Sequence, residues 1–296
     1  MTNATCPEES RTVRPKPSTP GGHEQLATGL SAGRPLVYGI LNVTPDSFSD
    51  GGLFDNPRRA LAHGRQLVDE GADLIDIGGE STRPGSRPPT VQEELTRVIP
   101  VIAALSQHVQ VPLSVDTSRP EVMRAAVAEG ASMINDVRAL RRPGALDAVA
   151  ELGVPVCLMH MHRSPHTMQV QPHYHDVVCE VRDFLGERLK AARGAGIGPE
   201  NLLVDPGFGF GKTLAHNLAL LARLADLSVL GAPILVGLSR KTMLAQITGC
   251  DVADRLIGSV AAALIAVQRG AQVLRVHDVA ATRDAVAVLH AVNSTC

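Results

Sequence analysis

A chain of 296 residues with 44% hydrophobic content can bury a large core, and its 28 basic against 30 acidic side chains leave a formal charge of −2. This balance provides no basic field for nucleic acid, so we expect no nucleic-acid partner. No apolar stretch approaches the ~20 residues of a membrane span, so we expect no membrane association. The five cysteines are odd in number and contain no Cys-x-x-Cys pair, which fits a reducing cytoplasm.

Residues 1–33 are rich in Thr, Pro, Ser, Gly, Glu and Arg, and they predict a disordered tail. Residues 34–296 predict a single domain, in which short apolar runs alternate with polar loops and amphipathic helical stretches. Eight runs have the continuous apolar character of strands buried on both faces. They span residues 35–41, 72–77, 111–115, 132–134, 154–159, 201–204, 233–236 and 272–276. Eight strand-helix units predict a (β/α)8 barrel.

Helical signals lie between these runs. Thr90 and Glu93 form a candidate capping box ahead of apolar residues at helical spacing in 95–105. Residues 118–121 give a second cap signature, and the apolar pattern in 256–265 predicts a late helix.

The carboxyl ends of the predicted strands are unusually polar. In a (β/α)8 barrel these ends meet at one mouth, where active sites lie. A single polar residue there is often a cap or a turn former, but polar groups at all eight ends indicate a site. These residues are Asn42, Asp76 with Glu80, Asp116, Asn135, His160, Asp205, Ser239 with Lys241, and Arg275 with His277.

Residues 205–213, Asp-Pro-Gly-Phe-Gly-Phe-Gly-Lys-Thr, form a candidate binding loop, here called the glycine loop. Three glycines in five residues let the backbone approach a ligand closely. The final Gly-Lys-Thr resembles the end of a P-loop, but that pattern needs glycine where the chain has Pro206. A P-loop nucleotidase is therefore disfavoured, and we assign Lys212 to the surface.

Histidines are concentrated in residues 160–175. They are His160, His162, His166, His173 and His175. Without cysteine ligands or a helical histidine pair, they indicate a polar loop rather than a dedicated zinc site.

Eight segments together resemble the dihydropteroate synthase family, the folate-pathway enzymes that sulfonamides inhibit, over roughly residues 34–290. The segments are 41–52, 78–85, 114–118, 134–136, 158–161, 205–212, 238–241 and 275–278. The resemblance implies a (β/α)8 barrel that joins p-aminobenzoate to 6-hydroxymethyl-7,8-dihydropterin pyrophosphate. The products are 7,8-dihydropteroate and pyrophosphate. Mg²⁺ as cofactor and a homodimer are implied in the same way.

The resemblance also implies roles for individual residues, with Asp116, Asp205, Lys241 and Arg275 as the catalytic set. The pterin would be bound by Asp116, Asn135, Met159, Asp205, Phe210, Lys241 and Arg275. Pyrophosphate would meet Asn42, Arg275 and His277, with Asn42 as the magnesium ligand. The p-aminobenzoate pocket and its loops would involve Phe48, Asp50, Thr82, Arg83, Pro84 and Thr242. Thr242 stands where the family commonly has serine, and it retains the hydroxyl.

Two other functions remain open from the sequence. A pterin-dependent methyltransferase-type barrel shares parts of these motifs, but it would lack the aminobenzoate loop at 81–85. A non-catalytic pterin-binding paralogue would keep the ring site without turnover. None of the quoted motifs is broken, which favours the enzyme.

Overall fold

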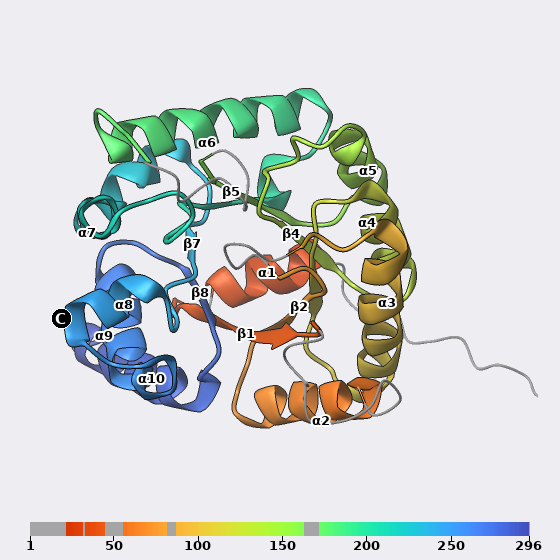
Figure 1. The fold of residues 1–296 in the computed structure, drawn as a ribbon, viewed down its shortest axis with the longest axis horizontal. Helices are drawn as coiled ribbons and strands as arrows, with labels where there is room; N and C mark the ends of the chain where they lie inside the picture. The colour runs from red at the N-terminus through yellow and green to blue at the C-terminus, as the bar shows by residue number, and fades with distance from the viewer. Residues whose placement is uncertain (1–21, 32, 45–55, 82–86, 163–171, 296) are drawn as a thin grey trace, which may run out of the picture.

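Eight parallel strands form one sheet in the order β6-β5-β4-β3-β2-β1-β8-β7. The computed structural model describes residues 22–31, 33–44, 56–81, 87–162 and 172–295. The two edges of the sheet meet where the Val204 N–H donates to the Pro233 carbonyl at 3.0 Å and Val204 bridges to Ile234. The sheet is therefore closed into the predicted (β/α)8 barrel, and helices surround it (Figure 1).

Each observed strand boundary lies within two residues of the predicted one. The strands are β1 (Leu36–Asn42), β2 (Leu74–Gly78), β3 (Leu113–Asp116), β4 (Met133–Asp136), β5 (Val156–Met159), β6 (Leu202–Asp205), β7 (Leu235–Val236) and β8 (Val273–Val276). The helices are α1 (Gly22–Ser31), α2 (Asn56–Asp69), α3 (Val91–His108), α4 (Pro120–Ala128), α5 (Ala145–Leu152), α6 (Val177–Gly194), α7 (Leu214–Ala222), α8 (Thr242–Thr248), α9 (Leu256–Gln268) and α10 (Val279–Asn293). The described residues also include the 3-10 helices η2 (Pro199–Asn201), η3 (Leu224–Leu230) and η4 (Val252–Asp254). No helix in the described ranges is long and apolar enough to cross a membrane.

One predicted helix cap is confirmed and the other is wrong. At α3, the Thr90 hydroxyl accepts from the Glu93 N–H at 3.2 Å, and the Glu93 carboxylate accepts from the Thr90 N–H at 2.6 Å. At α4, the N-cap is Arg119 without a side-chain cap, and Pro120 fixes the first turn. The Ser118 hydroxyl instead donates to the Asp136 carboxylate, because this strand end faces a neighbouring strand.

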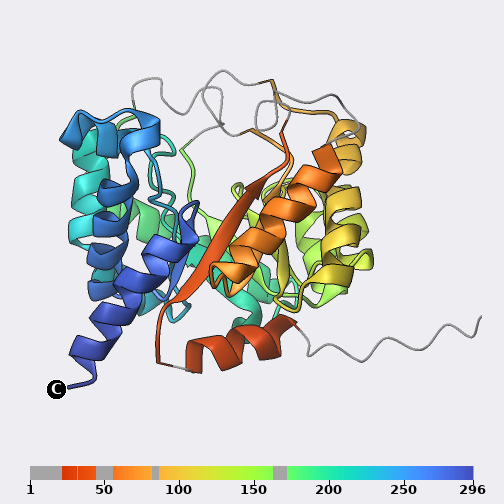
Figure 2. The same cartoon turned by 90° about the horizontal axis from the view of Figure 1, so that it is seen from below.

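The prediction of a disordered tail is wrong for residues 22–31, which form helix α1. Leu26 of α1 is buried in one cluster with Leu36, and Leu30 packs against that cluster. Figure 2 shows α1 across the barrel end at which the strands begin. The composition of this segment alone does not indicate a helix. Burial of its apolar side chains against the barrel offsets the conformational entropy that is lost when the segment becomes ordered. Residues 1–21 lie outside the described residues.

The barrel interior beneath the mouth is filled by one apolar layer. Its buried residues include Tyr38, Leu74, Met133, Cys157, Leu203, Leu235 and Val273, each on a different strand. Because side chains alternate along a strand, residues two positions further on point into the same interior. Counting on from this layer leads to Asp76, Asn135, Met159, Asp205 and Arg275.

Asp73 joins three parts of the barrel at the opposite end from the mouth. Its carboxylate contacts the Arg34 guanidinium at 2.6 Å, the Arg283 guanidinium at 3.1 Å and the Val37 N–H at 2.8 Å. We expect Asp73→Ala to lower the free energy of unfolding by about 2–3 kcal/mol, because charged hydrogen bonds are lost at a largely buried site. Urea unfolding measures this loss. A matching loss of kcat/KM in the folded variant would contradict a purely structural role for Asp73.

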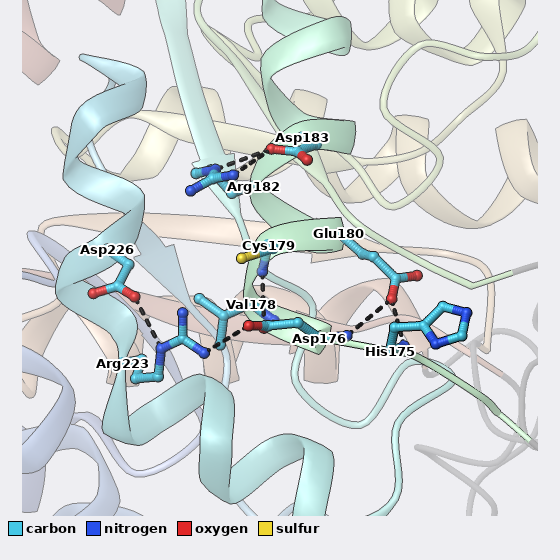
Figure 3. Close-up of polar contacts among 9 residues, drawn as sticks. All are labelled: His175, Asp176, Val178, Cys179, Glu180, Arg182, Asp183, Arg223 and Asp226. Atoms are coloured by element: carbon cyan, nitrogen blue, oxygen red, sulfur yellow. Dashed lines mark hydrogen bonds and ion pairs between the residues drawn. The ribbon is translucent and has the colours of Figure 1, made fainter.

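A polar network fixes the start of α6 (Figure 3). Asp176 is its N-cap, and Oδ1 accepts from the backbone N–H groups of Val178 at 2.9 Å and Cys179 at 3.1 Å. Its Oδ2 lies 2.9 Å from Arg223, which also contacts Asp226 at 2.9 Å. The hydrogen bond from Arg223 is the main cause of a lowered Asp176 pKa. These contacts connect the N-terminus of α6 to the residue that ends α7.

Candidate active site

The centre of the mouth is an ion-paired cluster around Arg275. Its Nε lies 2.5 Å from Asp76 Oδ2, and its Nη2 lies 2.9 Å from Asp116 Oδ2. Asn135 Nδ2 also donates to Asp76 Oδ2, at 3.3 Å. Although burial opposes the charge, Asp76 and Asp116 raise the pKa of Arg275. Burial raises the pKa of Asp116, and Arg275 opposes this effect.

Asp76 has a larger part in this cluster than the sequence interpretation gave it. It was named among the strand-end residues but received no binding role, although its side chain is only 1% exposed. Its position two residues beyond Leu74 on the inward face was the available signal. Among the described residues, Asp76 Oδ1 and Asn135 Oδ1 are buried acceptors without a hydrogen-bond partner. Such acceptors are satisfied when a ligand presents N–H donors.

Asp205 and Lys241 form the second charged part of the mouth. Asp205 is buried at the end of β6, and its Oδ1 accepts from the Gly207 N–H at 2.7 Å. Burial raises the Asp205 pKa, while this hydrogen bond and the nearby Lys241 oppose the rise. Burial lowers the pKa of Lys241 to about 8, and Asp205 opposes that shift. The Lys241 ammonium lies 4.2 Å from the centre of the Phe210 ring.

An apolar wall lies beside these charges. Met159 and Phe210, both predicted covers for a flat ring, pack in one buried cluster with Val137 and Met161. Cation–π contact with Lys241 holds the Phe210 ring in a defined position. The mouth therefore combines apolar surface with charged groups, as a site for a flat polar heterocycle requires.

The glycine loop takes a backbone path that requires glycine. Gly207, Gly209 and Gly211 have φ angles of 69°, 79° and 65°, in the left-handed region. A Cβ atom at Gly207 would lie 1.9 Å from the His160 carbonyl oxygen, and one at Gly209 would lie 3.3 Å from Lys241 Cδ. The loop therefore folds back closely over the end of β5 and against Lys241.

The assignment of Lys212 to the surface is wrong, because Lys212 is only 4% exposed. Its ammonium contacts His160 Nδ1 at 2.9 Å, the Gly207 carbonyl at 2.8 Å and the Phe210 carbonyl at 3.2 Å. The left-handed glycines turn the loop back on itself and bring Lys212 beneath it. A pattern of residue types does not encode that direction.

Asn42 and His277 lie at neighbouring strand ends of the mouth. Asn42 Oδ1 and Asp116 Oδ2 are 3.7 and 3.6 Å from the point where Gly78 would carry a Cβ atom, so both oxygens face the same space. His277 Nδ1 lies 3.0 Å from the Ser239 hydroxyl. Burial, followed by Arg275, lowers the His277 pKa to about 3, so the ring is neutral. In the tautomer in which Nδ1 accepts from Ser239, His277 Nε2 carries the proton and can donate it to an anion.

The remaining predicted residues have different outcomes. Thr242 begins α8 beside Lys241 and is exposed. Phe48, Asp50, Thr82, Arg83 and Pro84 lie outside the described residues. Glu80, named as a strand-end residue, pairs with Arg138 at 3.6 Å instead of entering the Arg275 cluster.

The histidine-rich segment is only partly described, because His166 lies outside the described residues. In the part that is described, no group of three or more His, Cys, Asp or Glu residues could hold a metal ion. His160 Nδ1 is hydrogen-bonded to the Lys212 ammonium, and the centre of the His162 ring lies 5.5 Å from that of Tyr174.

Fold and mouth together define a class of protein: a (β/α)8 barrel whose strand ends combine buried, unpartnered acceptors, an apolar wall and cationic side chains. The sequence matches the family of pterin binding enzymes over residues 38–277. It is 52% identical to dihydropteroate synthase of Escherichia coli over 264 residues, which cover 89% of this chain and 94% of that protein.

Solved structures agree with these sequence matches. Dihydropteroate synthase of Xanthomonas albilineans with 4-aminobenzoic acid has a TM-score of 0.84 and 61% identity, covering 88% of this chain and 94% of that one. The Yersinia pestis enzyme with a sulfonamide drug has a TM-score of 0.85 and 51% identity, covering 90% and 96%. The chain belongs to the pterin binding enzymes, and within them to the dihydropteroate synthase family.

Proposed function

We propose that this chain is a dihydropteroate synthase that condenses 6-hydroxymethyl-7,8-dihydropterin pyrophosphate with p-aminobenzoate. The observation that carries the proposal is the arrangement at the mouth. Buried acceptors on Asp76 and Asn135 lie beside the Arg275 ion pairs, and the unpartnered oxygens call for ligand N–H groups. The names and ligands of the relatives, including the bound 4-aminobenzoic acid, support the same reaction.

The pterin binds with its donor edge on the carboxylates. Its amino and ring N–H groups donate to Asp205 and to the unpartnered oxygens of Asp76 and Asn135, because buried carboxylate and amide oxygens are strong acceptors. Lys241 donates to the ring acceptors, and the rings lie against Met159 and Phe210. Asp116 and Asp205 stabilise the positive charge that develops on the pterin methylene carbon as the leaving group departs.

The pyrophosphate group binds between Asn42, His277 and Arg275. The His277 Nε2–H and the guanidinium donate to its oxygens, which stabilises the charge that grows as the carbon–oxygen bond breaks. The amide oxygen of Asn42, facing the same space as Asp116 Oδ2, fits the oxygen ligands that Mg²⁺ prefers. When bound, Mg²⁺ would neutralise part of the pyrophosphate charge.

The aromatic amine completes the reaction. Its nitrogen forms the new bond to the methylene carbon, pyrophosphate leaves with the electrons of the broken carbon–oxygen bond, and the amine proton passes to solvent or to the leaving group. The Thr242 hydroxyl beside Lys241 is our candidate contact for the p-aminobenzoate carboxylate. Phe48, Asp50, Thr82, Arg83 and Pro84 remain predictions for the rest of that pocket.

A direct assay tests the proposal. Purified protein is supplied with the pterin pyrophosphate, p-aminobenzoate and Mg²⁺, and dihydropteroate and pyrophosphate are measured. We expect both products in equal amounts, suppression by a sulfonamide, and loss of turnover with EDTA that Mg²⁺ restores. Pterin binding without product would support the non-catalytic paralogue instead. Methyl transfer from a methylated folate would support the methyltransferase reading.

We also propose a homodimer in a reducing cytoplasm. Apolar side chains are exposed along one stretch from α8 to α9: Ile247, Val252, Leu256, Ile257 and Ile265. A second copy of the chain would cover this surface. Among the described residues, Cys157, Cys179 and Cys250 are free thiols, which supports a reducing compartment. Sedimentation of wild type against Ile257→Glu tests the dimer, and a monomeric wild type would contradict it.

A further inference from the structure

Lys212 is a buried cation that the proposed reaction does not use. Its ammonium has three hydrogen atoms, and three acceptors surround it: His160 Nδ1 and the carbonyls of Gly207 and Phe210. Among the ion pairs of the described residues, none includes Lys212. A buried ammonium without a carboxylate in contact is costly, because it loses its water and gains no directly paired charge. The neutral stem of a methionine would fill similar space without that cost.

Gly207 connects Lys212 to Asp205. The Gly207 N–H donates to Asp205 Oδ1 at 2.7 Å, while its carbonyl accepts from the Lys212 ammonium at 2.8 Å. The third acceptor, the Phe210 carbonyl, belongs to the residue whose ring lies 4.2 Å from the Lys241 ammonium. Lys212 therefore holds the backbone of the glycine loop at Gly207 and at Phe210. These two residues determine the positions of the Asp205 carboxylate and of the Phe210 ring.

The charge of Lys212 acts in the same direction as its hydrogen bonds. Around the mouth, the carboxyl groups of Asp76, Asp116 and Asp205 face two cationic side chains, those of Arg275 and Lys241. Lys212 adds a third from beneath the glycine loop and opposes the rise of the Asp205 pKa. Its partner His160 has a pKa lowered to about 2, chiefly by burial, so that ring is neutral and accepts at Nδ1.

We propose that Lys212 is a positioning residue for Asp205: its ammonium fixes the Gly207 turn and places a positive charge near the carboxylate that receives the pterin donors. This inference rests on the proposed function of the mouth. It predicts that losing Lys212 weakens binding of the pterin substrate selectively, because the proposed function places the pterin, and not p-aminobenzoate, against Asp205.

The test uses the full chain and measures two substrates separately. We expect Lys212→Met to weaken the Kd for the pterin pyrophosphate at least tenfold at pH 6.5, measured by calorimetry without p-aminobenzoate. The KM for p-aminobenzoate at saturating pterin substrate should stay within twofold. Two variants serve as controls: Lys190→Met removes an exposed lysine of α6, and Tyr174→Phe removes a 3.0 Å hydrogen bond to the Gly211 carbonyl without changing charge. Both should bind the pterin substrate within threefold of wild type.

The pH dependence separates the charge from simple loosening of the loop. Burial lowers the Lys212 pKa to about 7, although Asp205 opposes this, so the lysine is charged below that pH and loses its charge above it. The advantage of wild type over Lys212→Met should therefore shrink between pH 6.5 and 8.5. Arg275 also faces Asp205 but stays charged over this range and cancels in the ratio. Lys241 faces Asp205 as well and has a pKa of about 8, so most of the change should already be present at pH 7.5, where Lys241 keeps most of its charge.

Several results would overturn the inference. Equal pterin affinity of wild type and Lys212→Met, an equal loss for both substrates, or a ratio unchanged with pH would each contradict it. If Lys212→Met does not fold, Lys212→Gln decides, because it keeps a donor towards Gly207 but no charge, and it should show the same selective loss. A wild-type protein that binds no pterin substrate would instead contradict the proposed function, and the inference about Lys212 would fall with it.

Discussion

Asp205→Asn should lower kcat/KM for dihydropteroate formation at least 100-fold while leaving the fold intact. The asparagine oxygen can still accept from the Gly207 N–H, which lies 2.7 Å from Asp205 Oδ1, so the glycine loop keeps its turn. The carboxylate charge is lost, and with it the charge-assisted bonds to the pterin donors, each worth about 1.5–3 kcal/mol. Stabilisation of the developing cation is lost as well. Steady-state kinetics with both substrates varied measures the change.

A matched control separates this effect from a general loss of carboxylate charge. Asp183 lies on α6, where its exposed carboxylate contacts Arg182 at 2.8 Å (Figure 3). Asp183→Asn should therefore leave kcat/KM within twofold of wild type, since surface ion pairs contribute little. Circular dichroism and thermal unfolding should be alike for both variants. Near-normal turnover of Asp205→Asn would contradict the proposed role of Asp205 in binding the pterin.

The barrel is predictable from the sequence because its strands are buried on both faces. Each is a short, mainly apolar run without a helical period, and its length and flanking polar or glycine-rich loops favour a strand over a buried helix. The polar strand ends are predictable for the same reason, since a change from apolar to polar marks where a strand leaves the interior. Asp116 and Arg275 both follow from this change in the sequence, and the structure places Arg275 Nη2 2.9 Å from Asp116 Oδ2.

Features that depend on tertiary contacts were not predictable. Helix α1 is ordered by burial of Leu26 against the barrel. Residues 22–31 lack the prolines of residues 1–21, but two leucines four residues apart are too short a pattern to predict a helix. Lys212 is buried because three left-handed glycines reverse the loop, and a glycine-rich pattern alone is compatible with either direction. Asp76 shares its strand with apolar residues, and only the inward register of β2 reveals that it meets Arg275.

Arg275→Met should remove activity and also destabilise the fold. The guanidinium lies between Asp76, at 2.5 Å, and Asp116, at 2.9 Å, and the variant leaves both carboxylates in the barrel without that partner. Breaking a buried ion pair in this way costs about 3–5 kcal/mol of unfolding free energy. We expect kcat/KM to fall about 1,000-fold, because Arg275 contributes to binding of both the pterin and the departing pyrophosphate. Urea unfolding and steady-state kinetics measure the two losses.

The destabilisation should depend on pH in a definite direction. In the variant, burial raises the Asp116 pKa without the opposing charge of Arg275, so the folded-state value lies further above the unfolded value of about 3.9. A group with a raised folded-state pKa favours the folded protein when protonated, and this contribution is lost as pH rises through that pKa. Because the wild-type Asp116 pKa is already about 8, both proteins lose this contribution alike below that pH, and Arg275→Met should unfold more easily relative to wild type at pH 9.5 than at pH 7.5. An equal difference at both values would show that the carboxylates do not carry the effect.

A second substitution distinguishes charge from packing. Arg275→Met combined with Asp116→Asn removes one negative charge together with the positive one, so part of the lost unfolding free energy should return and its pH dependence should weaken. If the loss came only from the cavity that the shorter methionine leaves, the second substitution would recover nothing. Activity should stay low in the double variant, because neither the guanidinium nor the Asp116 carboxylate is available to the reacting pterin. Recovery of stability without recovery of turnover would assign the Arg275 cluster two separable roles, one in holding the strand ends together and one in the reaction.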